Sequence, residues 1–335
     1  MGRRFRLALL ATLGLASILF GAYRHVRDIE DAEDLLRAVA TAHERVGYEG
    51  EGAWGNQWPG MWVMHDSRTG RTKYGTGPWS QVESAPSGRM PDPAAFCLDV
   101  DALLGNYRAH EGEPGRYLGR DVRTLRVEPR LEGRPSLEVL FDKETLLPLK
   151  VRTTRHDGVL LREAVFHSIF LGDRAVPRPF GPTPGGMGRT VAPEKADEEA
   201  GFPVWRPAYV PEGFRLLSCR VSRWMGPCVR ALYTDGVTAF ELWQRPVLLP
   251  AQIETIFQRA PGGAEFHVRW HRWCGLRALA RSGGADEDGI AVERHECGPH
   301  VRFEMRVRGS DVTLVTRADL DPEEPMRVLR SLEIR

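Results

Sequence analysis

Residues 136–170 read SLEVLFDKETLLPLKVRTTRHDGVLLREAVFHSIF, and this stretch decides the fold. Apolar residues alternate with other residues at 137–141 and again at 149–153, the period of two that predicts strands with a buried face. Asp142 begins a turn between them, because its carboxylate can fold back onto the backbone two residues further on. Asp157-Gly158 predicts a second tight turn before a third strand at 165–170. The stretch therefore predicts an antiparallel meander with one apolar and one basic face.

The bulk composition limits the classes of protein. At 335 residues the chain is long for one hydrophobic core, so we expect two domains. Lys and Arg number 46 and Asp and Glu 45, which leaves a net charge of +1. That balance implies neither a nucleic-acid partner nor an anionic surface.

The N-terminus indicates export. Three arginines, Arg3, Arg4 and Arg6, precede an uncharged apolar run at 7–23. Residues 1–27 are thus predicted to be a signal peptide or signal anchor that places the rest of the chain outside the cytoplasm. No candidate cleavage site has the expected small residues, which favours a retained anchor, although the run is short for a membrane span.

The region before the meander predicts helices and further strands. Residues 28–45 have apolar positions at three- and four-residue spacings and acids in the first turns, which is typical of an amphipathic helix. Residues 46–51 then alternate as a strand. A short helix is expected at 96–107, and a strand at 115–129 with a turn around Gly119.

The middle of the chain predicts a domain boundary. Residues 177–188 are rich in Pro and Gly and can sustain neither a helix nor a central strand. Together with the charged run that follows, they place a linker at 181–200, between a first domain at 28–180 and a second at 201–335. In the second domain an Asp-Gly turn at 235–236 separates two alternating strands, and residues 322–329 predict a short helix.

Several motifs resemble the MucB/RseB family of envelope-stress regulators. They are FDKETLLPLKV at 141–151, DGVLLREAVFHSIFLGD at 157–173, GRYLGRDVRTLRVEP at 115–129, PAYVPEGF at 207–214 and YTDGVTAFELW at 233–243. The central hairpin is also shared, more loosely, with carriers of outer-membrane lipoproteins. The motifs keep their order along most of the exported chain, and the resemblance is thinnest at 50–110 and 245–300.

The resemblance implies an α+β fold made mostly of antiparallel strands. The first domain would be a curled half-barrel sheet with covering helices, and the second a smaller β-rich domain. A curled sheet lined with aromatic and aliphatic residues can hold an acyl chain, whereas the alternative is that the same residues only fill the core. The residues predicted to line such a cavity are Trp54, Trp62, Leu137, Val139, Phe141, Val151 and Val165.

Five cysteines in an exported chain raise the possibility of disulfides. Cys219 and Cys228 flank a predicted turn at 224–227, so a cross-strand disulfide is expected between them. Cys274 and Cys297 would form a second disulfide and leave Cys97 over. The alternative is a zinc site, since His267, His271 and Cys274 have helical spacing. Strands would scatter these side chains over two faces, so we expect no metal and no cofactor.

The sequence favours a binding protein over an enzyme. It has no nucleophile elbow, metalloprotease motif, P-loop or dinucleotide fingerprint. The resemblance implies a periplasmic negative regulator of an envelope-stress sigma factor. Such a protein binds a membrane anti-sigma factor, protects it from proteolysis and senses lipid or lipoprotein in the half-barrel. The alternative function is a periplasmic lipid or lipoprotein carrier.

Overall fold

The chain separates into two units, Met1–Arg178 and Pro179–Arg335. The structure, a computed structural model, describes residues 31–54, 58–76, 80–84, 93–172, 188–223, 226–246, 292–297, 300–307, 310–317, 320–321 and 323–334. The predicted signal or anchor at 1–27 lies outside these ranges. Across the ranges that are described, no helix combines the length and apolar character needed to cross a membrane.

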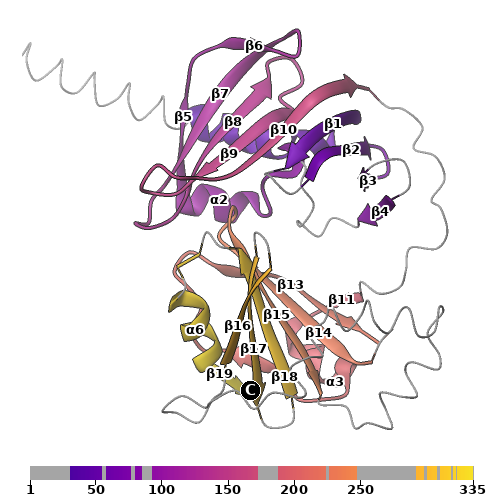
Figure 1. The fold of residues 1–335 in the computed structure, drawn as a ribbon, viewed down its shortest axis with the longest axis vertical. Helices are drawn as coiled ribbons and strands as arrows, with labels where there is room; N and C mark the ends of the chain where they lie inside the picture. The colour runs from indigo at the N-terminus through magenta and orange to yellow at the C-terminus, as the bar shows by residue number, and fades with distance from the viewer. Residues whose placement is uncertain are drawn as a thin grey trace, which may run out of the picture. The chain divides into compact units, whose positions relative to one another are not determined.

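The first unit is built on one open antiparallel sheet of ten strands (Figure 1). Its order is β4-β3-β2-β1-β10-β9-β8-β7-β5, and β6 pairs with β7 beside β5. The strands are β1 (Tyr48–Trp54), β2 (Trp58–Asp66), β3 (Arg71–Thr76), β4 (Ser80–Ser84), β5 (Tyr107–Glu111), β6 (Gly115–Tyr117), β7 (Arg120–Pro129), β8 (Ser136–Asp142), β9 (Pro148–Thr154) and β10 (Leu160–Leu171).

The predicted meander is β8-β9-β10, and its two turns lie where the sequence placed them. Asp142 folds back as expected, accepting hydrogen bonds from the backbone N–H of Glu144 at 3.2 Å and of Thr145 at 2.8 Å. Its other oxygen accepts a hydrogen bond of 2.5 Å from Arg120 Nε. The third strand begins at Leu160, five residues earlier than predicted, because Gly158 with φ +86° closes the turn at once.

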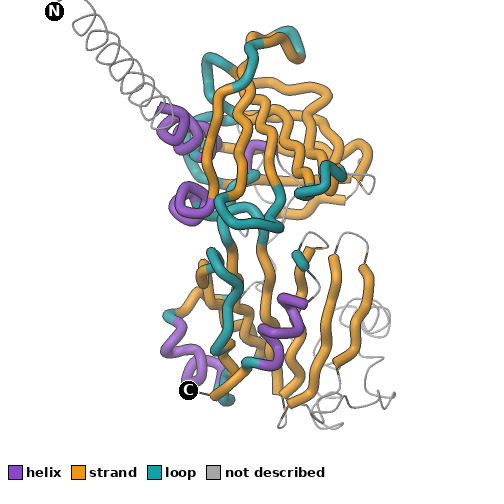
Figure 2. Tube along the Cα trace, turned by 90° about the vertical axis from the view of Figure 1, so that its left-hand side faces the viewer, coloured by secondary structure: helices purple, strands orange, loops and turns teal. Residues whose placement is uncertain are grey.

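Helical segments cover one face of this sheet. They are residues 31–40, η1 (Ala42–Glu44), η3 (Pro93–Ala95) and α2 (Val100–Asn106), seen beside the strands in Figure 2. Asp99 caps α2 by accepting a hydrogen bond of 3.1 Å from the Ala102 N–H. The helix predicted to run to residue 45 thus ends at residue 40 and is followed by a 3₁₀ turn, and the one predicted at 96–107 begins only after its Asp cap.

The β6-β7 hairpin replaces the single strand predicted at 115–129. The chain reverses at Leu118 and Gly119, whose φ values are +51° and +76°. Two successive residues with positive φ form the two-residue turn that is typical of β-hairpins. Glycine at position 119 adopts its positive φ with little conformational strain. The turn predicted at residues 119–121 is therefore present, but it begins at Leu118, one residue earlier than predicted.

The second unit contains a seven-stranded antiparallel sheet and a small two-stranded one. The large sheet has the order β11-β13-β14-β15-β18-β17-β16, and β12 pairs with β19. Its strands are β11 (Arg189–Val191), β13 (Arg215–Ser222), β14 (Cys228–Thr234), β15 (Ala239–Pro246), β16 (Val292–Cys297), β17 (His300–Val307) and β18 (Ser310–Arg317), with β12 (Trp205–Pro207) and β19 (Leu332–Ile334) apart. The helical segments are η5 (Pro193–Lys195), α3 (Ala196–Ala200) and α6 (Glu323–Arg330).

A buried amide joins the small sheet to the large one. Gln244 on β15 is 1% exposed; its Oε1 accepts from the Trp205 N–H and its Nε2 donates to the Trp205 carbonyl, both at 2.7 Å. A buried side chain that satisfies both backbone groups of one residue fixes the position of that residue. The predicted Asp-Gly turn is also present, with Asp235 Oδ1 accepting from the Val237 and Thr238 N–H groups.

The linker predicted at 181–200 ends earlier than expected. Residues 181–187 lie outside the described residues, but residues 189–200 form β11, η5 and α3 of the second unit. Ala196 and Ala200, one helical turn apart, are buried against a cluster that includes Cys219 and Val229. The charged residues around these two alanines led to the prediction of a linker, although the segment forms a short amphipathic helix. The mostly antiparallel α+β class is confirmed for the chain.

We expect Asp142→Ala to lower the free energy of unfolding by about 2–4 kcal/mol, measured by urea denaturation. Asp142 is 1% exposed and the substitution removes one partner of a buried ion pair together with the turn hydrogen bonds. Asp121→Ala is the matched control, because the Asp121 side chain is 74% exposed and its ion pair with Arg116 spans 3.5 Å. Equal losses in the two variants would contradict this account of the turn.

Candidate functional site

The inner face of the first sheet brings together four of the seven residues predicted to line a cavity. Leu137, Val139 and Phe141 on β8 are 3%, 0% and 0% exposed, and Val151 on β9 is 1% exposed. The ladder pairs Val139 directly with Val151, which places the two side chains on the same face. These four positions follow the period of two that the sequence predicted.

Two other residues predicted to line the cavity do not lie on the inner face of the sheet. Val165 pairs with Lys150 across the β9-β10 ladder, whereas its neighbour Ala164 pairs with the inner residue Val151. Trp62 lies between Met61 and Val63, which are buried, and is itself half-exposed opposite Glu51. Both therefore lie on the outer face, because successive side chains in a strand point to opposite sides. Trp54 ends β1, and its side chain lies outside what the structure describes.

The four inner residues are covered by the protein's own chain. The 3₁₀ segment η3 packs on β9 and β10, and Ala94 within it is 0% exposed. Leu36 and Val39 of the helix at 31–40 are likewise 0% exposed. Core packing thus accounts for the inner residues as they stand, and a guest between sheet and helices would have to replace these contacts.

Aromatic packing over two glycines holds β1 against β10 on the inner face. A Cβ at Gly50 would lie 2.7 Å from the Ser168 carbonyl oxygen and 2.8 Å from the Phe166 ring. At Gly52 it would lie 2.2 Å from the Val165 carbonyl oxygen. The Phe166 ring also meets Tyr48 edge-on, with centroids 6.0 Å apart. The strand that follows Tyr48 therefore requires glycine at alternate positions.

A pair of histidines lies where the helical cover meets the sheet. His65 on β2 is 5% exposed, stacks on Tyr48 with ring centroids 5.0 Å apart, and has Nδ1 2.8 Å from Thr72 Oγ1. His43 in η1 meets it edge-on at 6.2 Å. Sequence reasoning missed both, although His65 continues the buried alternation of Met61 and Val63.

Burial lowers the pKa of His43 below its ordinary value. Glu44 and the Ala40 carbonyl act in the opposite direction, and Arg45 adds to the lowering of this pKa. The charged form of His43 is therefore disfavoured at the junction of helix and sheet.

The predicted disulfide between Cys219 and Cys228 is not formed. The β13-β14 ladder pairs Cys219 with Ala231, and Cys228 with Ser222. The two cysteines are thus three ladder positions apart, about 10 Å along the strands, whereas a disulfide needs Cα atoms within about 7 Å. Sequence reasoning placed the turn correctly but could not place the register.

The remaining cysteine and histidine candidates are mostly outside the described residues. Cys274, His267 and His271 lie in the range 247–291 that the structure leaves undescribed. Cys297 and His300 pair at the ends of β16 and β17, but only their backbone is placed. The second disulfide and the expected absence of a metal thus stay predictions.

Comparison with known sequences identifies a relative for part of the chain. Residues 80–184 match the family model described as the MucB/RseB N-terminal domain. The chain is 31% identical over 153 residues to "Sigma factor AlgU regulatory protein MucB" of Pseudomonas aeruginosa. The alignment covers 45% of this chain and 48% of that protein, so it spans about half the length of the curated relative.

Solved structures resemble the chain over nearly its whole length. The "Crystal structure of MucB in complex with MucA(peri)" has a TM-score of 0.55 at 19% identity and covers 91% of this chain and 99% of that one. The "Crystal structure of MucB" has a TM-score of 0.56 at 17% identity and covers 91% and 98%. The class of protein is therefore a two-domain antiparallel α+β protein with the MucB fold. The family model and the MucB relative each match part of this chain, and the match to the family model includes the central hairpin region in which its motifs resemble the MucB/RseB family.

We expect the free energy of unfolding to fall as the pH is lowered from about 7 to about 5. The unfolded chain protonates His43 near the ordinary pKa of 6.5, while the folded chain resists protonation because its His43 pKa is lowered. The unfolded state then binds more protons, so stability decreases toward acid. Urea denaturation across this pH range provides the measurement.

The variant His43→Gln should reduce this pH dependence. His156→Gln is the matched control, because His156 is exposed on the turn before β10. If the slope of stability against pH is the same in His43→Gln as in the parent, His43 is not its source.

Proposed function

We propose that the protein is an extracytoplasmic negative regulator of an envelope-stress sigma factor. It acts by binding the periplasmic part of a membrane anti-sigma factor and shielding it from proteolysis. The observation that carries the proposal is the match to a sigma factor regulatory protein, in a chain whose two units both follow the MucB fold. The solved complexes of MucB with MucA support an anti-sigma factor as the partner.

The location follows from the N-terminal segment. Its arginines and its apolar run at 7–23 would direct the chain across the inner membrane, and the match to the MucB/RseB N-terminal domain supports the periplasm as its compartment. Retention of this run as an anchor would hold the regulator beside a membrane-bound partner and raise its local concentration there.

The role is one of binding rather than catalysis. The inner face of the first unit offers aliphatic and aromatic side chains, such as Val139 and Phe141, rather than a set of titratable groups around a reactive centre. A regulator needs surfaces that bind its partner and a core that changes when a signal arrives. Lipid or lipoprotein would supply that signal by entering between the first sheet and its helical cover.

A carrier function is less well supported. A carrier must present an open cavity to its cargo, whereas Leu137, Val139, Phe141 and Val151 are packed against the protein's own chain. A covered core is more consistent with a regulator that changes conformation, because a lipid ligand must then compete with the packing between the sheet and its helices.

Binding of the anti-sigma factor tests the proposal directly. The full chain in non-ionic detergent should bind the purified extracytoplasmic domain of the anti-sigma factor from the same genome with a Kd of about 1 μM or tighter, measured by isothermal titration calorimetry. The same domain should be cleaved more slowly by its regulatory protease when the protein is present. Absence of binding to any extracytoplasmic anti-sigma domain of that genome would refute the proposal.

The lipid signal should weaken this complex. If the acyl chains and the partner favour different arrangements of the first unit, a diacylated lipopeptide will raise the apparent Kd for the partner about 5- to 150-fold. The same peptide without acyl chains is the control and should leave the Kd unchanged. Equal effects of the two peptides would show that the acyl chains are not sensed.

A further inference from the structure

The outer face of the first sheet is divided into two parts of different chemistry. Across β8, β9 and β10 the charges pair with each other: Lys150 lies 2.8 Å from Glu163, and Arg152 lies 3.3 Å from Glu163 and 3.9 Å from Glu138. This part carries its own counter-charges. Solvent can cover it without a partner, and its ion pairs contribute little to stability.

The other part lies on β10, β1 and β2 and combines apolar and acidic side chains. The ladders place Glu51 between Ser168 and Trp62, and Glu49 between Phe170 and Met64. We call Trp62, Met64, Phe170, Glu49 and Glu51 the outer patch. Phe170 is 46% exposed, and the side chains of Trp62 and Met64 are partly buried beside it. Large apolar residues gathered on the solvent face of a sheet indicate an interaction surface.

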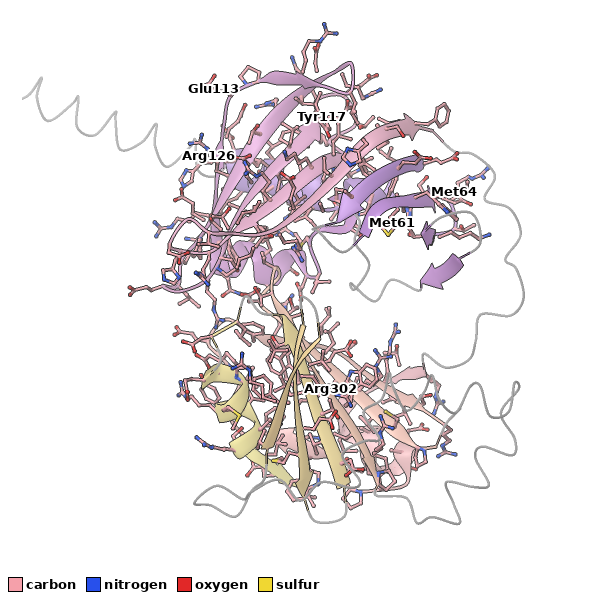
Figure 3. All side chains as sticks on the ribbon, viewed as in Figure 1. Met61, Met64, Glu113, Tyr117, Arg126 and Arg302 are labelled. Atoms are coloured by element: carbon pink, nitrogen blue, oxygen red, sulfur yellow. The ribbon has the colours of Figure 1, made fainter. Side chains whose placement is uncertain are left out.

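The alternation along β2 confirms which side the patch faces. Met61 and Val63 are 5% and 2% exposed and belong to the buried core, so Met64 is on the opposite side from Met61 (Figure 3). On β10, Ile169 and Leu171 pack toward that same core, which leaves Phe170 on the outer side. The patch is thus separate from the inner face that the proposed function uses.

The second unit contains a neighbouring Glu and Trp that together bind an arginine, and it serves as a model for Glu51 and Trp62. On β15, Glu241 and Trp243 lie on one face, and Trp243 Nε1 donates to the Glu241 carboxylate. Arg230 on β14 places its guanidinium 4.1 Å from the Trp243 ring centroid and 3.2 Å from Glu241 Oε2. One guanidinium therefore satisfies both the aromatic face and the carboxylate.

We infer that the outer patch binds an arginine-bearing apolar segment of another protein. The incoming guanidinium would stack on Trp62 and pair with Glu51, as Arg230 does with Trp243 and Glu241 in the second unit. Met64 and Phe170 would receive the apolar residues that flank the arginine, and the flexible thioether of Met64 adapts to different shapes. This inference does not depend on the proposed function.

The charges of the patch favour a protein segment over a membrane surface. Glu51 is an exposed carboxylate of this patch, and Lys73, opposite Met64 on β3, is only 6% exposed. Anionic lipid headgroups attract clusters of basic residues and are repelled by carboxylates. Arginine is favoured over lysine because its planar guanidinium stacks on an indole and pairs with a carboxylate at the same time.

Fluorescence anisotropy with a labelled octapeptide of alternating Leu and Arg tests the inference on the full chain in non-ionic detergent. We expect binding that Glu51→Gln weakens about three- to five-fold, the range of an exposed ion pair. Trp62→Leu should weaken it by about the same factor through loss of stacking. An alternating Leu–Lys peptide should bind more weakly than the Leu–Arg peptide. An alternating Leu–Glu peptide should not bind.

Glu138→Gln is the matched control, because Glu138 is likewise an exposed carboxylate, on the paired part of the same face. This variant should bind the Leu–Arg peptide like the parent. The inference is overturned if Glu138→Gln weakens binding as much as Glu51→Gln does, or if the Leu–Lys peptide binds as tightly as the Leu–Arg peptide. It is also overturned if neither patch variant changes the affinity, or if anionic vesicles bind through Trp62 while the peptide does not.

Discussion

The pairing of β1 with β10 is the constraint on which the first unit depends. It joins the N-terminal strands to the central meander, and every pair in this ladder, from Tyr48–Leu171 to Trp54–Ala164, links residues more than a hundred positions apart in the chain. The pairing is possible because Gly50 and Gly52 let the Phe166 ring and the Val165 carbonyl approach the backbone. Any side chain at Gly52 would meet that carbonyl oxygen at 2.2 Å, so β1 and β10 would have to move apart at this point.

This pairing also separates the two proposed binding surfaces of the unit. The bulge in the β1-β10 ladder, at Glu51 and Gly52, keeps Phe166 on the inner face and turns Phe170 to the outer one. The inner face is apolar and covered by helices, whereas the outer face carries Glu51 and Trp62. A ligand between sheet and helices and a protein on the outer face would thus contact opposite sides of the same strands, and β1 is the element through which the two can influence each other.

Local patterns predicted the strands well and the long-range arrangement poorly. The meander, the Asp142 turn, the Asp235-Gly236 turn and the final helix follow from period, turn residues and capping, all of which act over a few residues. The register between strands does not follow from such local patterns. The Cys219–Cys228 disulfide was therefore wrongly predicted, and Trp62 and Val165 were assigned to the wrong face of the sheet. A shift of one residue in a strand exchanges its two faces, and only the pairing of distant strands determines that shift.

The covered inner face sets the size of any ligand that can act on it. Exposing Leu137, Val139, Phe141 and Val151 would cost on the order of 6–12 kcal/mol, at about 1.5–3 kcal/mol for each buried side chain. A small apolar molecule cannot replace contacts of that extent. One acyl chain of about sixteen carbons gains roughly 12 kcal/mol when buried, at about 0.8 kcal/mol for each methylene group. Under the proposed lipid sensing, the core would therefore select long acyl chains, because only they would offset the separation of sheet and helices.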